Sequence, residues 1–255
     1  MKKQLISNSK SLKINISKLY KTTSLLAIAL ILSVTSLTAL ITPKAGATSL
    51  PNMVADPSFD IGSGFQNGNN SISVTAIQPD GKILVGGTFT SFNGSTQNCL
   101  IRLNSDGSKD TSFDIGSGFD NTIFSINVQS NGKILAGGQF TSFNGSTQNR
   151  LIRLNADGSK DTSFDIGTGL NGAVNTITIQ PDSKILVGGA FTSFNGSTQN
   201  RLIRLNSDGS KDSSFDIGTG LNEAVNTTTI QPDGKILVGG AFTSFNGSTQ
   251  NRLIR

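Results

Sequence analysis

The sequence predicts an all-β protein made of four copies of one unit. The phrase that begins at Gln78 returns at Gln129, Gln180 and Gln231, a constant step of 51 residues. Each copy holds short runs of Val, Ile, Phe and Thr between turn signals, which is typical of strands. No stretch keeps the 3.6-residue period of an amphipathic helix. Copies of this length are expected to stack on one another, because none of them buries a core alone.

Each copy contains four expected strands, which the third copy illustrates. They cover 173–180, 184–192, 201–206 and 213–217, and the tight turns between them carry Pro-Asp, Asn-Gly and Asp-Gly. The segment "SFNGSTQN" is expected to be a turn-rich loop between the second and third strands. Four antiparallel strands in a unit of about 50 residues are typical of one propeller blade. We therefore predict a β-propeller of four-stranded antiparallel blades, with four blades in this chain.

The two ends of the repeat region complement each other. Residues 56–61 ("DPSFDI") repeat the fourth strand without the first three, and the last copy has the first three without a fourth. We expect the N-terminal strand to pair with the C-terminal blade and close the ring, which would remove exposed sheet edges. Two alternatives stay open: the chain is a fragment of a longer array, or two chains share one larger ring.

The first 47 residues differ in composition from the repeats. They hold seven lysines and no acidic residue, and an apolar run at 24–41 precedes the small residues Ala45 and Ala47. This pattern predicts a signal peptide at 1–47, a short linker at 48–55 and a repeat domain at 56–255. An uncleaved membrane anchor is the alternative. We expect a secreted, periplasmic or cell-surface protein that contacts a membrane only through the N-terminal segment, if that segment is uncleaved.

The charge of the repeats argues against one class of partner. Without the leader, the chain has 14 Lys and Arg against 16 Asp and Glu. Binding to nucleic acid requires a clustered positive surface. We therefore expect no nucleic-acid partner.

The residue types present exclude most catalytic sites. The chain has no histidine and one cysteine, so neither a Ser-His-Asp site nor a zinc site of His and Cys can form. An enzyme with paired Asp carboxylates remains an alternative, but the acidic residues recur at equivalent positions and are more simply structural. We predict no catalytic, cofactor or metal residues. Calcium at Asn104, Asp106 and Asp110 is the one cofactor alternative.

Two further residue positions carry expectations. Cys99 stands where the later copies have Arg150, Arg201 and Arg252, so we expect Cys99 to face solvent. Arg102 is expected to pair with Asp114 across neighbouring strands.

Two phrases carry a family resemblance. "DGKILVGGAFTSFNG" at 233–247 and "RLNSDGSKDSSFDIGTG" at 204–220 resemble the delta-60 repeat family, bacterial secreted β-propeller-type repeats of unknown function. The resemblance covers residues 56–255. It implies a propeller fold and export, and it implies no catalytic residues.

These observations together predict an exported, non-enzymatic binding or surface-display module. Its "SFNGSTQN" loops are uncharged and rich in amide and hydroxyl groups, which suit hydrogen bonds to a glycan or protein ligand. The candidate ligand rim consists of Asn93, Gln97, Asn144, Gln148, Asn195, Gln199, Asn246 and Gln250. The alternative is a purely structural surface protein that self-associates.

Overall fold

The computed structural model describes residues 55–66 and 71–255. Residues Asp56–Arg255 form one compact unit, separate from Met1–Ala55. The predicted signal peptide and residues 48–54 of the predicted linker lie outside the described residues. The described part of the chain contains strands and turns but no helix, so the all-β prediction is confirmed. No helix in this part is therefore long and apolar enough to span a membrane.

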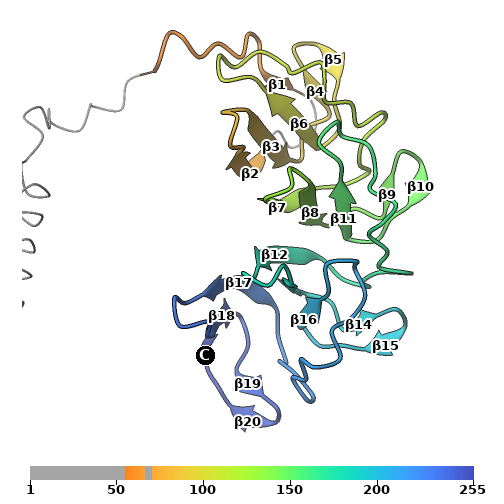
Figure 1. Cartoon of the computed structure of the whole chain (residues 1–255), viewed down its shortest axis with the longest axis vertical. Coiled ribbons are helices and arrows are strands. Elements are labelled where there is room, and N and C mark those ends of the chain that lie inside the picture. Colours follow the sequence, from red (N-terminus) through yellow and green to blue (C-terminus); the bar gives the residue numbers. More distant parts are fainter. Residues whose placement is uncertain (1–54, 67–70) are drawn as a thin grey trace, which may run out of the picture. The chain divides into compact units, whose positions relative to one another are not determined.

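Each repeat forms one three-stranded antiparallel sheet in which the second strand lies in the middle (Figure 1). The strand bounds agree closely with the first three strands predicted for each copy. The sheets consist of β2 (Ile72–Ile77), β3 (Ile83–Gly87) and β6 (Leu100–Leu103); β7 (Ile123–Val128), β8 (Ile134–Gly138) and β11 (Leu151–Leu154); β12 (Val174–Ile179), β13 (Ile185–Gly189) and β16 (Leu202–Leu205); and β17 (Val225–Ile230), β18 (Ile236–Gly240) and β21 (Leu253–Ile254).

The "SFNGSTQN" loop of each repeat contains a second, smaller element. Two strands of two residues each form a hairpin around the Asn-Gly pair. In the third repeat Asn195 has φ 49° and Gly196 has φ 74°, as a tight hairpin turn requires. The hairpins are β4 (Ser91–Phe92) with β5 (Ser95–Thr96), β9 (Ser142–Phe143) with β10 (Ser146–Thr147), β14 (Ser193–Phe194) with β15 (Ser197–Thr198), and β19 (Ser244–Phe245) with β20 (Ser248–Thr249); β1 (Phe65–Gln66) pairs with β4.

The predicted fourth strand is wrong. Its segment forms turns in the first three repeats, and the outer edge of each sheet carries only an isolated bridge, such as Leu103 to Lys109. The cause is local, because Asp and Ser side chains compete with the ladder for backbone groups. Asp110 Oδ1 accepts hydrogen bonds from the backbone and the hydroxyl of Ser112, and Asp114 Oδ1 accepts one from the Gly116 amide.

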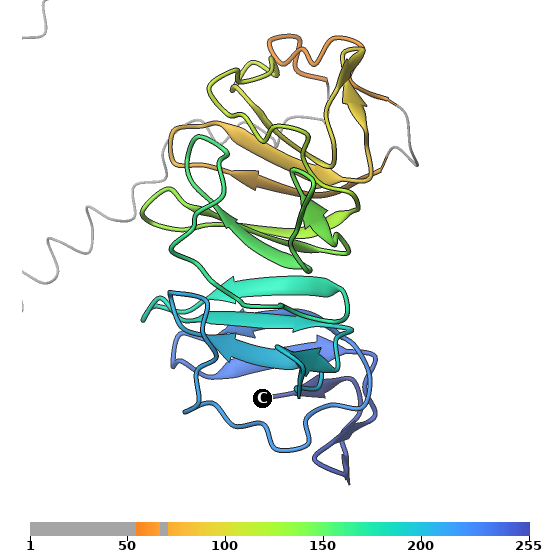
Figure 2. The ribbon, with the colours of Figure 1, turned by 90° about the vertical axis from the view of Figure 1, so that its right-hand side faces the viewer.

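The sheets pack in the order of the repeats. Strand β2 contacts β7, β7 contacts β12 and β12 contacts β17, and Figure 2 shows the sheets as successive layers. The paired glycines permit this approach. A Cβ added to Gly188 would meet Val225 of the next repeat at 2.5 Å, whereas the equivalent Gly239 of the last repeat has only Thr227 and the Arg252 carbonyl near it. Glycine is therefore required where one sheet lies directly against the next.

The core fills the spaces between repeats. Phe89, Phe140, Phe191 and Phe242 are fully buried, one in each repeat. Leu151 of β11 belongs to a cluster that otherwise consists mostly of third-repeat residues. The first residue of the third strand thus points into the following repeat, where burial of apolar surface stabilises the stack.

The predicted ring closure is also wrong. The N-terminal segment packs on the first repeat, where the Asp60 amide donates to the Asp106 carbonyl at 2.8 Å and β1 pairs with β4. The same forward bond joins Asp114 to Asp157 in the next repeat. The "SFD" segment therefore reaches the turn of the repeat that follows it in sequence, and residues 56–61 do so as well. No strand pairing joins the first and fourth sheets among the described residues.

Candidate functional site

The structure shows what the Asn residues of the candidate rim contact. Asn93 Oδ1 accepts a hydrogen bond from the Gly64 amide at 2.9 Å and another from the Ser63 hydroxyl. Asn144, Asn195 and Asn246 make the equivalent bonds to Gly118, Gly169 and Gly220. These side chains are exposed, but their carbonyl groups join the hairpin to the preceding segment.

The Gln residues of the candidate rim have a similar role. Gln97, Gln148 and Gln199 are buried, and each donates through Nε2 to the carbonyl of the residue three positions later. Gln250 makes the same contact with Leu253. The Ser-Thr pair of each hairpin, such as Ser95 and Thr96, is exposed beside the rim residues. The rim remains a prediction, and its accessible groups are the exposed Asn side chains and these neighbouring hydroxyls.

The Arg of each third strand lies in a charged cluster rather than beside the predicted partner. Arg102 Nε donates to Asp110 at 2.6 Å, and Lys82 Nζ lies 2.8 Å from the same carboxylate. Arg102 also stacks on Phe113, with its guanidinium carbon 4.6 Å from the ring centroid. The predicted pairing of Arg102 with Asp114 is therefore wrong.

This cluster is built to stabilise the fold. Burial opposes ionisation of Asp110, but hydrogen bonds from Lys82, Ser112 and Arg102 together hold the pKa of Asp110 below its usual range. Arg102 Nη1 also donates to the Ala156 carbonyl of the next repeat at 2.6 Å. The ion pairs recur around Asp161 and Asp212, and the bond to the next repeat recurs once, from Arg153 Nη1 to the Ser207 carbonyl.

Two of the three residues proposed for calcium, Asp106 and Asp110, have carboxylate oxygens engaged in other contacts. Asp106 accepts from Ser108, and Asn104 donates to Ser108, while Asp110 faces two cationic side chains. No group of three His, Cys, Asp or Glu residues suited to a metal ion is found in the described part of the chain.

Cys99 is buried, with 5% of its surface exposed, so the prediction that it faces solvent is wrong. The cause is its backbone conformation. Cys99 has φ 65°, and Arg150 at the equivalent position has φ 70° with matching hydrogen bonds to the neighbouring strands. The backbone therefore directs residue 99 into a cleft between repeats. Burial and, less strongly, the charge of Asp120 raise the pKa of Cys99 to about 11, so its sulfur is a neutral thiol at pH 7.

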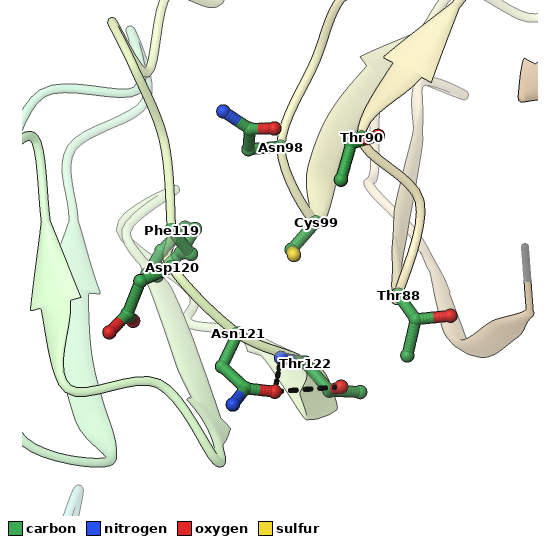
Figure 3. A pocket seen from close by; sticks show the side chains of 8 residues that line it. All are labelled: Thr88, Thr90, Asn98, Cys99, Phe119, Asp120, Asn121 and Thr122. Carbon is green, nitrogen blue, oxygen red and sulfur yellow. Dashed lines mark hydrogen bonds between the residues drawn. The ribbon is translucent and has the colours of Figure 1, made fainter. Parts of the chain in front are cut away.

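Clefts lie beside Cys99, Arg150 and Arg201, and their linings coincide at four repeat-equivalent positions. The cleft at Cys99 has a volume of about 520 Å³, against about 300 Å³ and about 280 Å³ for the clefts at Arg150 and Arg201. Figure 3 shows the Cys99 sulfur pointing into the space between the first repeat and the segment that leads into β7. The residues that line it are Thr88, Thr90, Asn98, Cys99, Phe119, Asp120, Asn121 and Thr122.

The extra volume has a direct cause. In the later clefts an arginine crosses the space: Arg150 Nη1 donates to the Gln139 carbonyl, and Arg201 Nη1 donates to the Ala190 carbonyl. Arg201 Nη2 also donates to the Asn222 carbonyl of the following repeat at 3.4 Å. Cys99 has no such side chain, so the first cleft lacks the group that fills the others.

Further substitutions accompany this loss. At four positions the later clefts agree with each other, and the first cleft differs from both. The first cleft has Cys99, Phe119, Asp120 and Thr122, where the second has Arg150, Leu170, Asn171 and Ala173 and the third has Arg201, Leu221, Asn222 and Ala224. Relative to the second cleft, Cys99 in place of arginine and Asp120 in place of asparagine make the first cleft more negative by two unit charges. The third repeat has Glu223 at the position of Asn121, so the difference from the third repeat is one unit charge.

Asp120 keeps the structural contacts of the asparagine that it replaces. It accepts hydrogen bonds from the amides of Thr141 at 2.8 Å and Ser142 at 3.0 Å, as Asn171 does from Thr192 and Ser193. Burial raises the pKa of Asp120, but these bonds and the Thr141 hydroxyl outweigh burial and lower it overall. The carboxylate is therefore ionised at neutral pH, and only its charge is new to the cleft.

This cleft was not found by reasoning from the sequence. The signal was present, because Cys99 aligns with three arginines and Asp120 aligns with two asparagines. The missing information was spatial, since residues 99 and 120 belong to different repeats and meet only when the sheets pack.

The family follows from the four repeats whose packing is described above. The model of a family described as "Domain of unknown function (DUF5122) beta-propeller" matches residues 78–113, 129–164, 180–215 and 231–255, more than half of the chain. The chain belongs to this β-propeller repeat family. The four matches coincide with the four repeats and run from the second strand of each sheet through the third. No curated protein matches the chain.

Proposed function

We propose that this propeller-repeat protein is an exported, non-enzymatic binding module whose binding site is the cleft at Cys99. The observation that supports this proposal is the difference among the three clefts. A scaffold role alone requires the same contacts in every repeat, and the two later clefts share the bond from the arginine to the carbonyl of Gln139 or Ala190. The first cleft has lost its internal arginine and gained volume and negative charge.

The chemistry of the cleft favours binding over catalysis. The chain has no histidine to act as a general base near neutral pH. The thiolate is the reactive form of cysteine, and the raised pKa of Cys99 disfavours it. Polar and apolar groups lie together around an open space, as is usual for ligand sites.

Export and the finer family assignment belong to the same proposal. The leader pattern at 1–47 and the resemblance to delta-60 repeats support a secreted, periplasmic or cell-surface location in a bacterium. The balanced charge of the repeats supports a protein or glycan ligand rather than a nucleic acid. The hydroxyls of the hairpin rim would add weak contacts to such a ligand.

The test compares the wild-type protein with the double variant Cys99→Arg and Asp120→Asn on arrays of defined peptides and glycans. The variant restores residues that the later repeats already contain, so it is expected to fold. We expect array ligands that bind the wild type and lose at least about tenfold in affinity with the variant, which corresponds to about 1.4 kcal/mol. If the wild type and the variant bind the same array ligands with equal affinity, the proposal is contradicted.

The rim requires a separate variant. Asn93→Ala is unsuitable, because Asn93 has φ 49° and its side chain holds Gly64. Ser95→Ala with Thr96→Val changes two exposed hydroxyls instead. A loss of array binding in this variant, with the cleft intact, would place the ligand on the rim.

A second candidate function is self-association through the face of the fourth sheet. Leu253 is 57% exposed, whereas its equivalents Leu100, Leu151 and Leu202 are buried. An apolar pocket of about 390 Å³ on this face includes Ile217, Val238 and Ile254. Sedimentation of the wild type and Leu253→Asp distinguishes this function, which predicts an assembly that the variant abolishes.

A further inference from the structure

The first cleft has the form of a site from which an arginine has been removed. The later clefts show the occupied state: the Arg150 guanidinium donates to the Gln139 carbonyl, and the Arg201 guanidinium lies between two backbone carbonyls, Ala190 of one repeat and Asn222 of the next. The equivalent carbonyls in the first cleft belong to Thr88 and Asp120. Because the strand pairing and the φ at residue 99 are preserved, these carbonyls lie in the same framework.

The acceptors in the first cleft are not taken over by another group. The described residues supply no hydrogen-bond donor to the Thr88 carbonyl, and Cys99 is too short to replace the guanidinium. A carbonyl at a site that is partly enclosed is stabilised by any donor that reaches it. The first cleft therefore keeps the acceptors of an arginine site and lacks the donor.

The charge has changed in the direction that favours an external cation. In the later clefts the internal arginine supplies the positive charge, and the neighbouring residue is the neutral Asn171 or Asn222. In the first cleft the positive charge is absent, and Asp120 supplies a negative one. The charge of Asp120 acts at the position of the Cys99 sulfur, where it disfavours the thiolate. A carboxylate and planar carbonyl acceptors together suit the fork of N–H donors of a guanidinium better than the point charge of an ammonium group.

We infer that the cleft at Cys99 binds a guanidinium group supplied by another molecule. The external guanidinium would donate to the Thr88 and Asp120 carbonyls and would be attracted by the Asp120 carboxylate. The inference rests on the proposed function, because it names the ligand class of the same cleft. It adds that this ligand would restore the guanidinium bond that Arg150, Arg201 and Arg252 make to the carbonyl equivalent to that of Thr88.

The test uses blocked arginine, N-acetyl-arginine-N-methylamide, titrated into the ¹⁵N-labelled protein and followed by NMR. We expect saturable shifts of amides around Thr88 and Thr122. Blocked lysine is the control for charge. We expect blocked lysine to bind at least about fivefold more weakly than blocked arginine, because an ammonium group cannot bridge two acceptors. Equal affinity for lysine would overturn the guanidinium assignment.

Three variants make the test specific. Cys99→Arg places an internal guanidinium in the cleft and should weaken blocked arginine at least about tenfold. Asp120→Asn keeps the structural hydrogen bonds and should weaken it about two- to fivefold, with less dependence on salt. Arg201→Cys combined with Asn222→Asp should create a second site and raise the stoichiometry to about two. Unchanged binding by Cys99→Arg would refute the inference.

The source of the guanidinium is tested separately with agmatine and an arginine-containing peptide. Tighter binding of the peptide supports a protein ligand, and equal binding supports a small free cation; either result retains the guanidinium site. If the array ligands lose affinity with the double variant but blocked arginine does not bind, the binding function stands and the guanidinium inference fails.

Discussion

One leucine position tests how much each repeat depends on the next. Leu151 is 0% exposed and packs into the third repeat, whereas the equivalent Leu253 is 57% exposed. Both are the first residue of the third strand and lie beside a Gly of the central strand. The substitutions Leu151→Ala and Leu253→Ala therefore make the same chemical change at the same place in the repeat. Only the neighbouring repeat differs.

The expected cost follows from this difference in burial. Leu→Ala in a packed core costs about 2–5 kcal/mol, because the transfer free energy is lost and a cavity remains. We expect about 3 kcal/mol for Leu151→Ala. Leu253 has less than half of its surface buried, and no sheet within the described residues packs over it to form a cavity wall, so we expect about 1 kcal/mol or less for Leu253→Ala.

The assay is urea unfolding followed by far-UV circular dichroism, since the chain contains no tryptophan. With a slope of about 2 kcal/mol/M, Leu151→Ala should lower the midpoint by about 1.5 M urea, and Leu253→Ala by about 0.5 M or less. The comparison holds where both variants keep the wild-type slope. Equal shifts would refute the reasoning, because they would mean that both positions are covered alike.

Four further predictions concern packing, charge and burial. Gly188→Ala should destabilise the protein by about 1–3 kcal/mol, because the added methyl group would meet Val225, and Gly239→Ala should cost less; thermal melts of the pair check this, and equal melting temperatures would contradict the close packing. Asp161→Asn should cost about 3–5 kcal/mol in urea unfolding at pH 7, because it leaves buried Arg153 without its carboxylate; a change under 1 kcal/mol would contradict that role. Since the pKa of Asp161 is lowered in the folded protein, its contribution is present above about pH 5 and lost as the pH falls below about 4; a stability that stays level from pH 6 to pH 2 would oppose it. The Cys99 thiol should react with Ellman's reagent at pH 8 at least about tenfold more slowly than in urea, and equal rates would show that the thiol is not buried.

The fold was largely predictable from the sequence because the repeats carry it. The bounds of the first three strands follow from runs such as "KILVGG" between turn signals, and the structure changes them by only a few residues. The prediction of a fourth strand in each repeat was wrong for a physical reason. "SKDSSFDI" alternates plausibly, but Asp and Ser side chains bond to nearby amides and form turns instead. Local hydrogen bonds of this kind are not visible in a hydrophobic pattern.

The candidate site was less predictable than the fold. Arg102 and Asp114 were expected to pair because both were placed in neighbouring strands. The loss of the fourth strand moved Asp114 into a turn and left Asp110 beside Arg102. Cys99 was expected to face solvent because arginine stands at the equivalent positions. Those arginines instead extend along a cleft and donate to backbone carbonyls, so their equivalent position can be half-buried or, with the shorter Cys99 side chain, buried.

The most direct test of the central claim is a crystal structure of the protein soaked with agmatine. The account predicts a planar guanidinium between the first and second repeats, within about 3 Å of the Thr88 and Asp120 carbonyl oxygens. It also predicts no agmatine in the clefts occupied by Arg150 and Arg201. Agmatine absent from the first cleft, or present equally in all three, would contradict the account.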